Sequence, residues 1–179
     1  MISHPTTEQL ERAVGVICKV IGQIPCFYLY EVYVANRFCS TESEIALKAM
    51  THNAALDSAL LNLRCFNEFF KPDGRSDDVR AYHFPDLSME PFLTTDEEQA
   101  IHKHLAHLTV TRVDIAGKRW MLDDMTIRGL QQAVQFISFI EERFSGLTHE
   151  GHAELLGLHE IVNRLIIKIA KRHAAEGAS

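Results

Sequence analysis

The chain has 179 residues, of which 46% are hydrophobic and 23% are charged, and its formal net charge is −6. This composition is typical of a globular protein with a full core and excludes a disordered chain. The negative charge argues against a protein that coats itself with nucleic acid through bulk electrostatics, although it allows a local basic cleft. Charged and proline residues interrupt the most apolar early stretch, residues 14–35. We therefore expect no membrane-spanning helix, no secretory signal and a cytoplasmic location.

The cysteines form no C-x-x-C pair, and each lies among apolar residues in the sequence. A free cysteine in such surroundings behaves as a small hydrophobic residue, so we expect thiols in the core. The spacing does not support a disulfide framework or a zinc knuckle. The four residues are Cys18, Cys26, Cys39 and Cys65.

Two helices are expected before residue 40. Thr6 and Gln9 form a capping-box pattern that predicts a helix start, followed by apolar residues at helical spacing. Pro25 should end or kink this helix near Gly22. The next segment, Cys26 to Phe38, is rich in aromatic and β-branched residues, which alone would allow a strand. Its length and its helical neighbours favour a buried helix.

The longest helix is predicted from about Ser43 to Phe70. The residues Lys71-Pro72-Asp73-Gly74 end it, because proline and glycine do not continue a helix. Its apolar side is expected to consist of Ala46, Met50, Ala54, Leu60, Leu61, Leu63, Phe66 and Phe69.

A long ordered loop is expected at residues 75–94. Thr95 with Glu98 forms a second capping-box pattern, which predicts a helix that continues to about Thr109. Residues 110–122 have a weak two-residue alternation around a glycine, which allows a small hairpin but favours a second ordered loop.

Two more helices complete the chain. Asp123 or Asp124 is expected to cap the first of them, and Thr148 to open the second. The second ends in a basic stretch, Arg164 to Arg172, which suits a helix C-terminus better than it indicates a nucleic-acid-binding tail. We find no internal repeat and no linker, so the sequence predicts one all-α domain over residues 1–179. The expected architecture is an up-and-down bundle of five to six helices.

Chemically reactive side chains are concentrated in the helix that holds Ile101 to Thr109. At 100° per residue, His104 and His107 lie about 60° apart, whereas His102 lies about 140° from His107. Three histidines of this helix therefore cannot bind one metal ion together. His104 and His107 could still bind a metal if other helices supply ligands, but we expect no metal and no other cofactor.

Acid–base chemistry on RNA is the second interpretation of this helix. An imidazole has an ordinary pKa near 6.5, so it can take and give a proton close to neutral pH. Such a group can activate the 2′-hydroxyl of RNA while cations stabilise the phosphorane, and this reaction needs no metal. Lys103 lies about 40° from His107 on the helix surface. The phosphate-binding candidates elsewhere are Arg64, Arg80 and Arg112, provided that the fold brings them near.

The segment His102-Lys103-His104-Leu105-Ala106-His107 resembles the Arg-polar-x-x-x-His signature of the HEPN superfamily of helical nucleotide- and RNA-binding domains. Its context is similar to that in uncharacterised bacterial HEPN-like proteins related to abortive-infection factors. The resemblance covers roughly residues 52–120 in motifs and the helical bundle in architecture. The context consists of Asn62-Leu63-Arg64, Asp77-Asp78-Val79-Arg80-Ala81 and Ala106-His107-Leu108-Thr109.

The resemblance implies roles for individual residues. His107 takes the place of the catalytic histidine, and Lys103 takes the polar place after the arginine. His102 stands where the family has arginine, and imidazole lacks the permanently charged fork with which arginine grips phosphate. Arg64, Arg80, His104 and Arg112 are then the expected substrate-binding residues. Family members pair as homodimers that place two copies of the site in one cleft, and some have lost catalysis.

Three hypotheses follow. In the first, a HEPN-like protein of phage defence or a toxin–antitoxin system, with an antitoxin as partner, binds RNA or nucleotide and cleaves RNA without a metal. In the second, an inactive HEPN-like domain serves dimerisation and partner binding. In the third, the bundle binds a metal through His104, His107 and residues of other helices.

Overall fold

The computed structural model describes residues 5–34, 41–75, 78–106, 122–143 and 149–177, with only the helical backbone for 106, 149–156 and 173–177. Its elements are α1 (Thr7–Gln23), α2 (Cys26–Tyr33), α3 (Glu42–Phe69), the short 3₁₀ helix η2 (Ala81–His83), α4 (Thr95–Ala106), α6 (Leu122–Arg143) and α7 (His149–Gly177). The described part of the chain contains no strand. The predicted all-α bundle is therefore confirmed.

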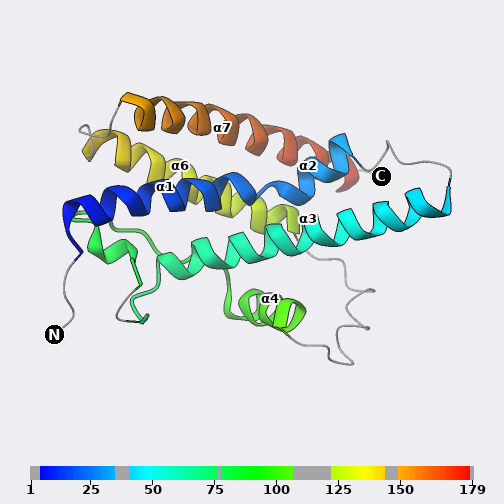
Figure 1. Cartoon of the computed structure of the whole chain (residues 1–179), viewed down its shortest axis with the longest axis horizontal. Helices are drawn as coiled ribbons and strands as arrows, with labels where there is room; N and C mark the ends of the chain where they lie inside the picture. The colour runs from blue at the N-terminus through cyan, green and yellow to red at the C-terminus, as the bar shows by residue number, and fades with distance from the viewer. Residues whose placement is uncertain (1–4, 35–40, 76–77, 107–121, 144–148, 178–179) are drawn as a thin grey trace.

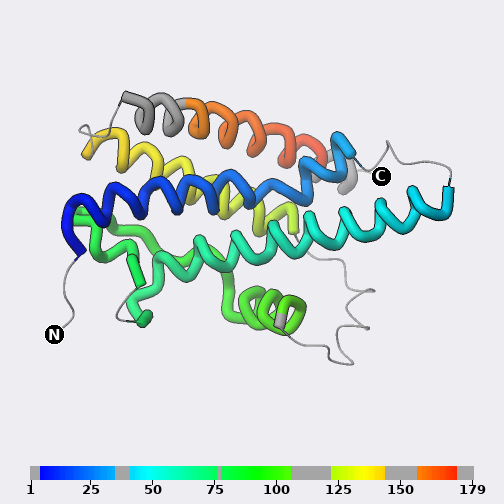
Figure 2. Tube along the Cα trace, in the orientation of Figure 1, coloured from blue at the N-terminus to red at the C-terminus, as the bar shows by residue number. Residues whose placement is uncertain are grey.

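Helix α3 is the central element of the bundle. It packs against α1, α2, α4 and α6, while α7 packs against α6 and α1. Figure 1 shows α1, α3, α6 and α7 running roughly along the long axis of the molecule, with α4 lying outside them across α3. The same view shows the first turns of α3 extending beyond the ends of the other helices, and the tube in Figure 2 traces this projection clearly.

Apolar spacing places one side of each long helix in the core. In α1 the buried residues recur every three or four positions, so one stripe faces inward. Aromatic rings from α3, α6 and the loop before α4 meet edge to face at the centre, a favoured geometry for aromatic pairs. The rings are those of Phe66, Phe69, Phe70, Phe84 and Phe136.

The segment Thr7–Tyr33 is long and apolar enough, by length and composition, to cross a membrane. In the fold, however, the apolar stripe of α1 contributes to the core cluster with Leu10, Val14, Ile17 and Ile21. The core helix of a soluble protein has the same composition.

The N-termini of α1 and α3, capped by Thr6 and Thr41, are set by local sequence signals. At Thr6 both hydrogen bonds of the predicted capping box are formed, and α1 ends at Gln23, just before Pro25. Thr41 and Glu44 form a second capping box that starts α3 one residue before the predicted position.

The prediction of a helix after Pro25 is confirmed over α2, whereas its burial is confirmed only in part. Tyr28 and Tyr30 are buried, but Val32 and Tyr33, at the end of α2, are exposed. The expected position of the thiols was also wrong in detail, since Cys65 is exposed.

Two predictions of position need correction. The capping box before α4 is Thr94 with Glu97 and not Thr95 with Glu98, because Glu98 faces α3. Helix α6 begins at Leu122, so Asp123 and Asp124 lie in its first turn and do not cap it.

Part of the apolar side predicted for the longest helix is exposed. Met50 is 69% exposed and Leu61 is 49% exposed, whereas Leu60 and Leu63 are fully buried. At 100° per residue, Met50 and Leu61 lie about 140–160° from Leu63. The predicted residues therefore belong to two faces of α3, of which only one meets the core. Residues 107–121, which include the expected loop at 110–122 except for its last residue, lie outside the described part.

Candidate functional site at the junction of α3 and α4

Helix α4 is attached to the bundle through a small apolar contact and a larger set of polar ones. Ile101 is fully buried, and Leu105 packs against the same core. The other contacts of α4 with α3 are hydrogen bonds and ion pairs made by Glu98, His102 and His104. The charged faces of two helices therefore meet at this junction.

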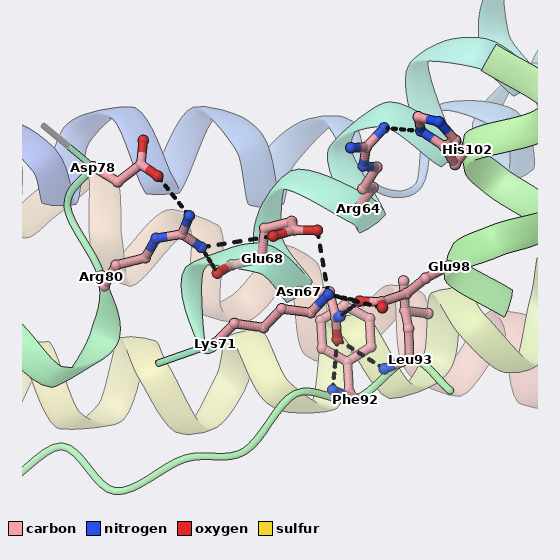
Figure 3. A network of polar contacts seen from close by, with 10 residues as sticks. All are labelled: Arg64, Asn67, Glu68, Lys71, Asp78, Arg80, Phe92, Leu93, Glu98 and His102. Carbon is pink, nitrogen blue, oxygen red and sulfur yellow. Dashed lines mark hydrogen bonds and ion pairs between the residues drawn. The ribbon is translucent and has the colours of Figure 1, made fainter. Parts of the chain in front are cut away.

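The amide of Asn67 holds the loop before α4 in place. This side chain is fully buried, and its Oδ1 accepts hydrogen bonds from the backbone N–H groups of Phe92 (2.7 Å) and Leu93 (2.8 Å). Its Nδ2 donates to a carboxylate oxygen of Glu98. Figure 3 shows the amide pointing from α3 to the loop on one side and to Glu98 on the other. Because α4 begins two residues after Leu93, this one side chain sets the position of the helix start.

Glu98 also pairs with Lys71, beyond the last turn of α3. Lys71 Nζ donates to Glu98 Oε2 over 2.8 Å and to Glu68 Oε1 over 3.3 Å. Burial alone would lower the pKa of Lys71, but its hydrogen bonds to the two carboxylates outweigh this effect and raise the pKa. Lys71 therefore pairs with both carboxylates that line this end of the junction.

Arg80 lies at the other end of this network, where its guanidinium is buried and bound by neighbouring residues of the protein. Only 8% exposed, it donates to the backbone oxygen of Glu68 and, over 2.6 Å, to Asp78 Oδ2. The backbone N–H of Arg75 and the Arg80 guanidinium together hold the pKa of Asp78 below its ordinary value. In Figure 3 the Arg80 guanidinium points to Glu68 and Asp78, away from Arg64 and His102. It ties the loop after α3 to the helix end.

An open depression of about 320 Å³ lies where α3 and α4 meet. Its carboxylates are the two that Lys71 binds, one of which is also 3.7 Å from Arg80. Among the described residues, no carboxylate lies within ion-pair distance of its two cations, Arg64 and Lys103. The lining residues are Arg64, Glu68, Glu98, Gln99, His102 and Lys103.

Arg64 and His102 contact each other across this depression. Arg64 Nη1 lies 3.2 Å from His102 Nδ1. A guanidinium can only donate hydrogen bonds, so Nδ1 accepts and the imidazole is the neutral form with its proton on Nε2. The pair thus presents a fixed cation beside an N–H donor.

His104 lies at a separate contact. Its Nε2 is 3.0 Å from Asp57 Oδ1, and its side chain is 14% exposed. It is not among the residues that line the depression. The structure therefore brings together Arg64, His102 and Lys103 of the predicted site and places Arg80 and His104 in other contacts.

The remaining predicted site residues, His107 and Arg112, lie outside the described part of the chain. Within the described part, no group of three or more His, Cys, Asp or Glu side chains could hold a metal ion.

Sequence reasoning missed the residues that complete the junction, namely Asn67, Glu68, Glu98 and Gln99. Asn67 carries a usable signal, because it is a lone amide between Phe66 and Phe69 on the apolar side of a helix. A buried amide must be hydrogen-bonded, so such a residue predicts a polar partner from another element.

The comparisons with known proteins leave the site to be judged on its geometry. No family model matches the chain, and neither a curated protein nor a solved structure matches it.

Proposed function

We propose that this protein binds RNA through a backbone phosphate held in the depression between α3 and α4. The observation that carries the proposal is the charge pattern of the depression. Its carboxylates are already paired with Lys71, whereas no described carboxylate neutralises Arg64 or Lys103. Two cations beside an N–H donor are the groups that bind phosphate oxygens.

The three groups would contribute differently. The planar fork of Arg64 can bind two phosphate oxygens at once, and Lys103 adds a mobile point charge. The Nε2–H of His102 adds a neutral donor, provided that Arg64 keeps its contact with Nδ1. The depression is open, which suits a polymer backbone that crosses the surface better than an enclosed small ligand.

The net charge of −6 sharpens this proposal. A protein with this charge repels nucleic acid over most of its surface, so binding must come from a local site. The RNA affinity should therefore depend strongly on two or three side chains and on salt.

The proposal extends to metal-independent cleavage, in which His107 acts as the acid or base that the sequence predicts. In such a reaction the 2′-hydroxyl loses its proton and attacks the phosphorus, and the 5′-oxygen leaves with a proton. His102, which Arg64 holds in the neutral form, would stay a hydrogen-bond donor to the phosphate, so the second proton would come from the imidazolium that His107 forms when it takes the first one. The HEPN resemblance favours a cytoplasmic phage-defence or toxin–antitoxin protein with an antitoxin partner.

Fluorescence anisotropy with a labelled single-stranded RNA of about 20 nucleotides tests the binding proposal. Replacing one phosphate contact should weaken binding about 10-fold at low salt, so we expect this loss for Arg64→Gln and for Lys103→Gln. Each variant should also reduce the slope of log K against log salt by about one. The matched control is Arg164→Gln on α7, whose guanidinium is exposed and pairs only within its own helix.

Equal RNA affinity for the wild type and both site variants would overturn the binding proposal. Thermal unfolding of each variant should show that the fold is retained, since Arg64 is only half-buried and Lys103 lines an open surface.

A ribonuclease assay with and without chelator tests the catalytic extension. Cleavage that survives the chelator and is lost in His107→Ala would support it. RNA binding without cleavage under any condition would reject catalysis and leave an inactive binding domain. Cleavage that requires an added metal would reject the metal-independent step.

A further inference from the structure

The first half of α3 has an exposed apolar surface without a counterpart in the described bundle. Leu47 is 46% exposed and Met50 is 69% exposed, and both belong to the first half of α3, whose first turns project beyond the other helices (Figure 1). Farther along, Leu61 is also exposed although it lies within the bundle. Helices that expose such residues in sequence usually meet a partner helix.

These residues form one continuous seam. Successive members are three or four positions apart, which is the spacing of a helix that packs along its length against another helix. The seam spans about 33 Å at 1.5 Å per residue and lies opposite the side of α3 that meets the core. It consists of Ser43, Leu47, Met50, Ala54, Ser58, Leu61 and Cys65.

The seam is self-complementary about Ala54. When a second α3 lies antiparallel with its Ala54 opposite this one, Leu47 faces Leu61 of the second copy, and Met50 faces its Ser58. The two leucines thus pack against each other, and Met50 fills the space above the small Ser58. The small Ala54 at the centre allows the two helices to approach closely. A surface that matches itself under a twofold rotation is what a symmetric dimer requires.

We propose that a second copy of this chain docks along this seam, antiparallel, with the twofold axis at Ala54. The occupant is inferred from the match of this seam with itself, which an unrelated partner would not need. Asp57 and Arg64 flank the seam on the side where α4 lies, so charged groups border the apolar contact. This order, an apolar centre with a polar rim, is usual in protein interfaces.

The dimer would place two RNA sites on one face of the assembly, and this consequence rests on the proposed function. In an antiparallel pair the same flank of each helix meets its counterpart, so both α4 helices lie on one side. Arg64 is ten residues beyond Ala54, which puts the two Arg64 residues about 30 Å apart along the helices. The result is two separate sites instead of the shared cleft that the HEPN resemblance implies.

The test of the dimer is independent of RNA. Light scattering coupled to size exclusion should give the wild type twice the mass of the 20.3 kDa chain. Met50→Asp should give a monomer, because burying an unpaired carboxylate in an apolar contact should raise the dimer Kd by at least about 100-fold. Met50 is so exposed that this change should not disturb the folded chain. Ile45→Asp is the matched control, since Ile45 is 65% exposed but lies on the opposite side of α3 from Met50 and Ala54.

Cross-linking tests the register. Ser43 should face Cys65 of the second copy, so oxidation of Ser43→Cys should yield a covalent dimer whose peptide map joins these two positions. Ile45→Cys should not form that link. A monomeric wild type at about 100 µM, an unchanged mass for Met50→Asp, or a dimer without the Ser43→Cys link would each overturn the proposal. If the wild type is monomeric and Met50→Asp loses thermal stability, the seam is covered by this chain itself.

If the dimer is confirmed but RNA affinity does not depend on Arg64, the interface stands and the proposed function fails. If the wild type is monomeric but Arg64→Gln weakens RNA binding, the opposite holds. The two proposals can therefore be distinguished in the same set of variants.

Discussion

Arg64 on α3 donates a hydrogen bond to Nδ1 of His102 on α4, across 3.2 Å. A guanidinium cannot accept a hydrogen bond, so this contact requires a neutral imidazole whose proton is on Nε2. An imidazolium at the same place would set an N–H against the guanidinium. The contact therefore fixes the tautomer that the depression presents to a ligand.

We expect long-range proton–nitrogen NMR at neutral pH to show His102 protonated on Nε2. Arg64→Met removes the donor at Nδ1, so the fraction with the proton on Nδ1 should rise. His159, which contacts Glu141 and lies between α6 and α7, serves as the internal reference. Detection of His102 as an imidazolium or as the Nδ1–H form in the wild type would contradict the contact.

The second prediction concerns the buried amide of Asn67. Asn67→Ala leaves the backbone N–H groups of Phe92 and Leu93 without their acceptor. Unsatisfied buried groups cost about 1–3 kcal/mol each, so we expect the free energy of unfolding to fall by about 2–4 kcal/mol. Urea unfolding measures this difference.

Asn62→Ala is the matched control, because its amide donates only to Ser58 in the same helix. We expect a change within about 0.5 kcal/mol, as for a surface position. If both variants lower the free energy of unfolding by the same amount, the hydrogen bonds from Asn67 to the loop do not contribute to stability.

The start of α4 shows how far the sequence can be used. The residues Thr94-Thr95-Asp96-Glu97-Glu98 allow two capping boxes, one residue apart, and the local pattern fits both. Long-range contacts decide between them, because Glu97 is bound by Arg128 of α6 and Glu98 by Asn67 and Lys71 of the α3 end. The helices were predictable from spacing and the start of α1 from its capping box at Thr6, but the start of α4 was not.

The same distinction applies to the candidate site. The sequence indicated Arg64 as a phosphate partner of the His102 helix, and the fold places the two in contact. The sequence indicated Arg80 as a phosphate-binding residue as well, but its guanidinium is bound by the backbone oxygen of Glu68 and by Asp78. Asp78, two positions from Arg80, is a local partner of its guanidinium, but Glu68 and His102 lie 12 and 38 positions from the arginines that they contact, so the sequence alone does not show which arginine is engaged.

The third prediction concerns glycines in helices. A Cβ added at Gly129 of α6 would lie 2.8 Å from a methyl group of Leu63 and 3.2 Å from the ring of Phe92. Leu63 is fully buried, so the core must shift, and overpacking of this kind costs about 1–3 kcal/mol. We expect Gly129→Ala to lower the melting temperature despite the better helix propensity of alanine.

Gly15→Ala in α1 should have the opposite effect. No atom lies within 4 Å of the added Cβ, so the substitution should stabilise the protein by about 0.5–1 kcal/mol. Calorimetry of both variants checks the pair. A Gly129→Ala protein as stable as Gly15→Ala would show that α3, α6 and the loop are not packed this closely.

The fourth prediction concerns acid stability and rests on Glu97. Burial raises the pKa of this carboxyl, but hydrogen bonds from Thr94 and from Arg128 outweigh burial and hold the pKa below its ordinary value of 4.5. A carboxyl with a lowered folded-state pKa contributes stability above its unfolded pKa. It loses that contribution as the pH falls through the folded pKa. The wild type should therefore lose stability as the pH is lowered below about 4.5.

Glu97→Gln isolates this contribution, because glutamine can still accept the capping hydrogen bond from Thr94. We expect the variant to be less stable than the wild type by about 0.5–1.5 kcal/mol at pH 7, through loss of the charged bond to Arg128. Near pH 3 the difference should shrink, since the wild-type carboxyl then gains a proton as well. Asp96→Asn is the control for the helix dipole alone, because Asp96 is exposed in the same first turn. A deficit of Glu97→Gln that is the same at both pH values would mean that the charge of Glu97 does not stabilise α4, and that only its shape and hydrogen-bonding oxygen matter.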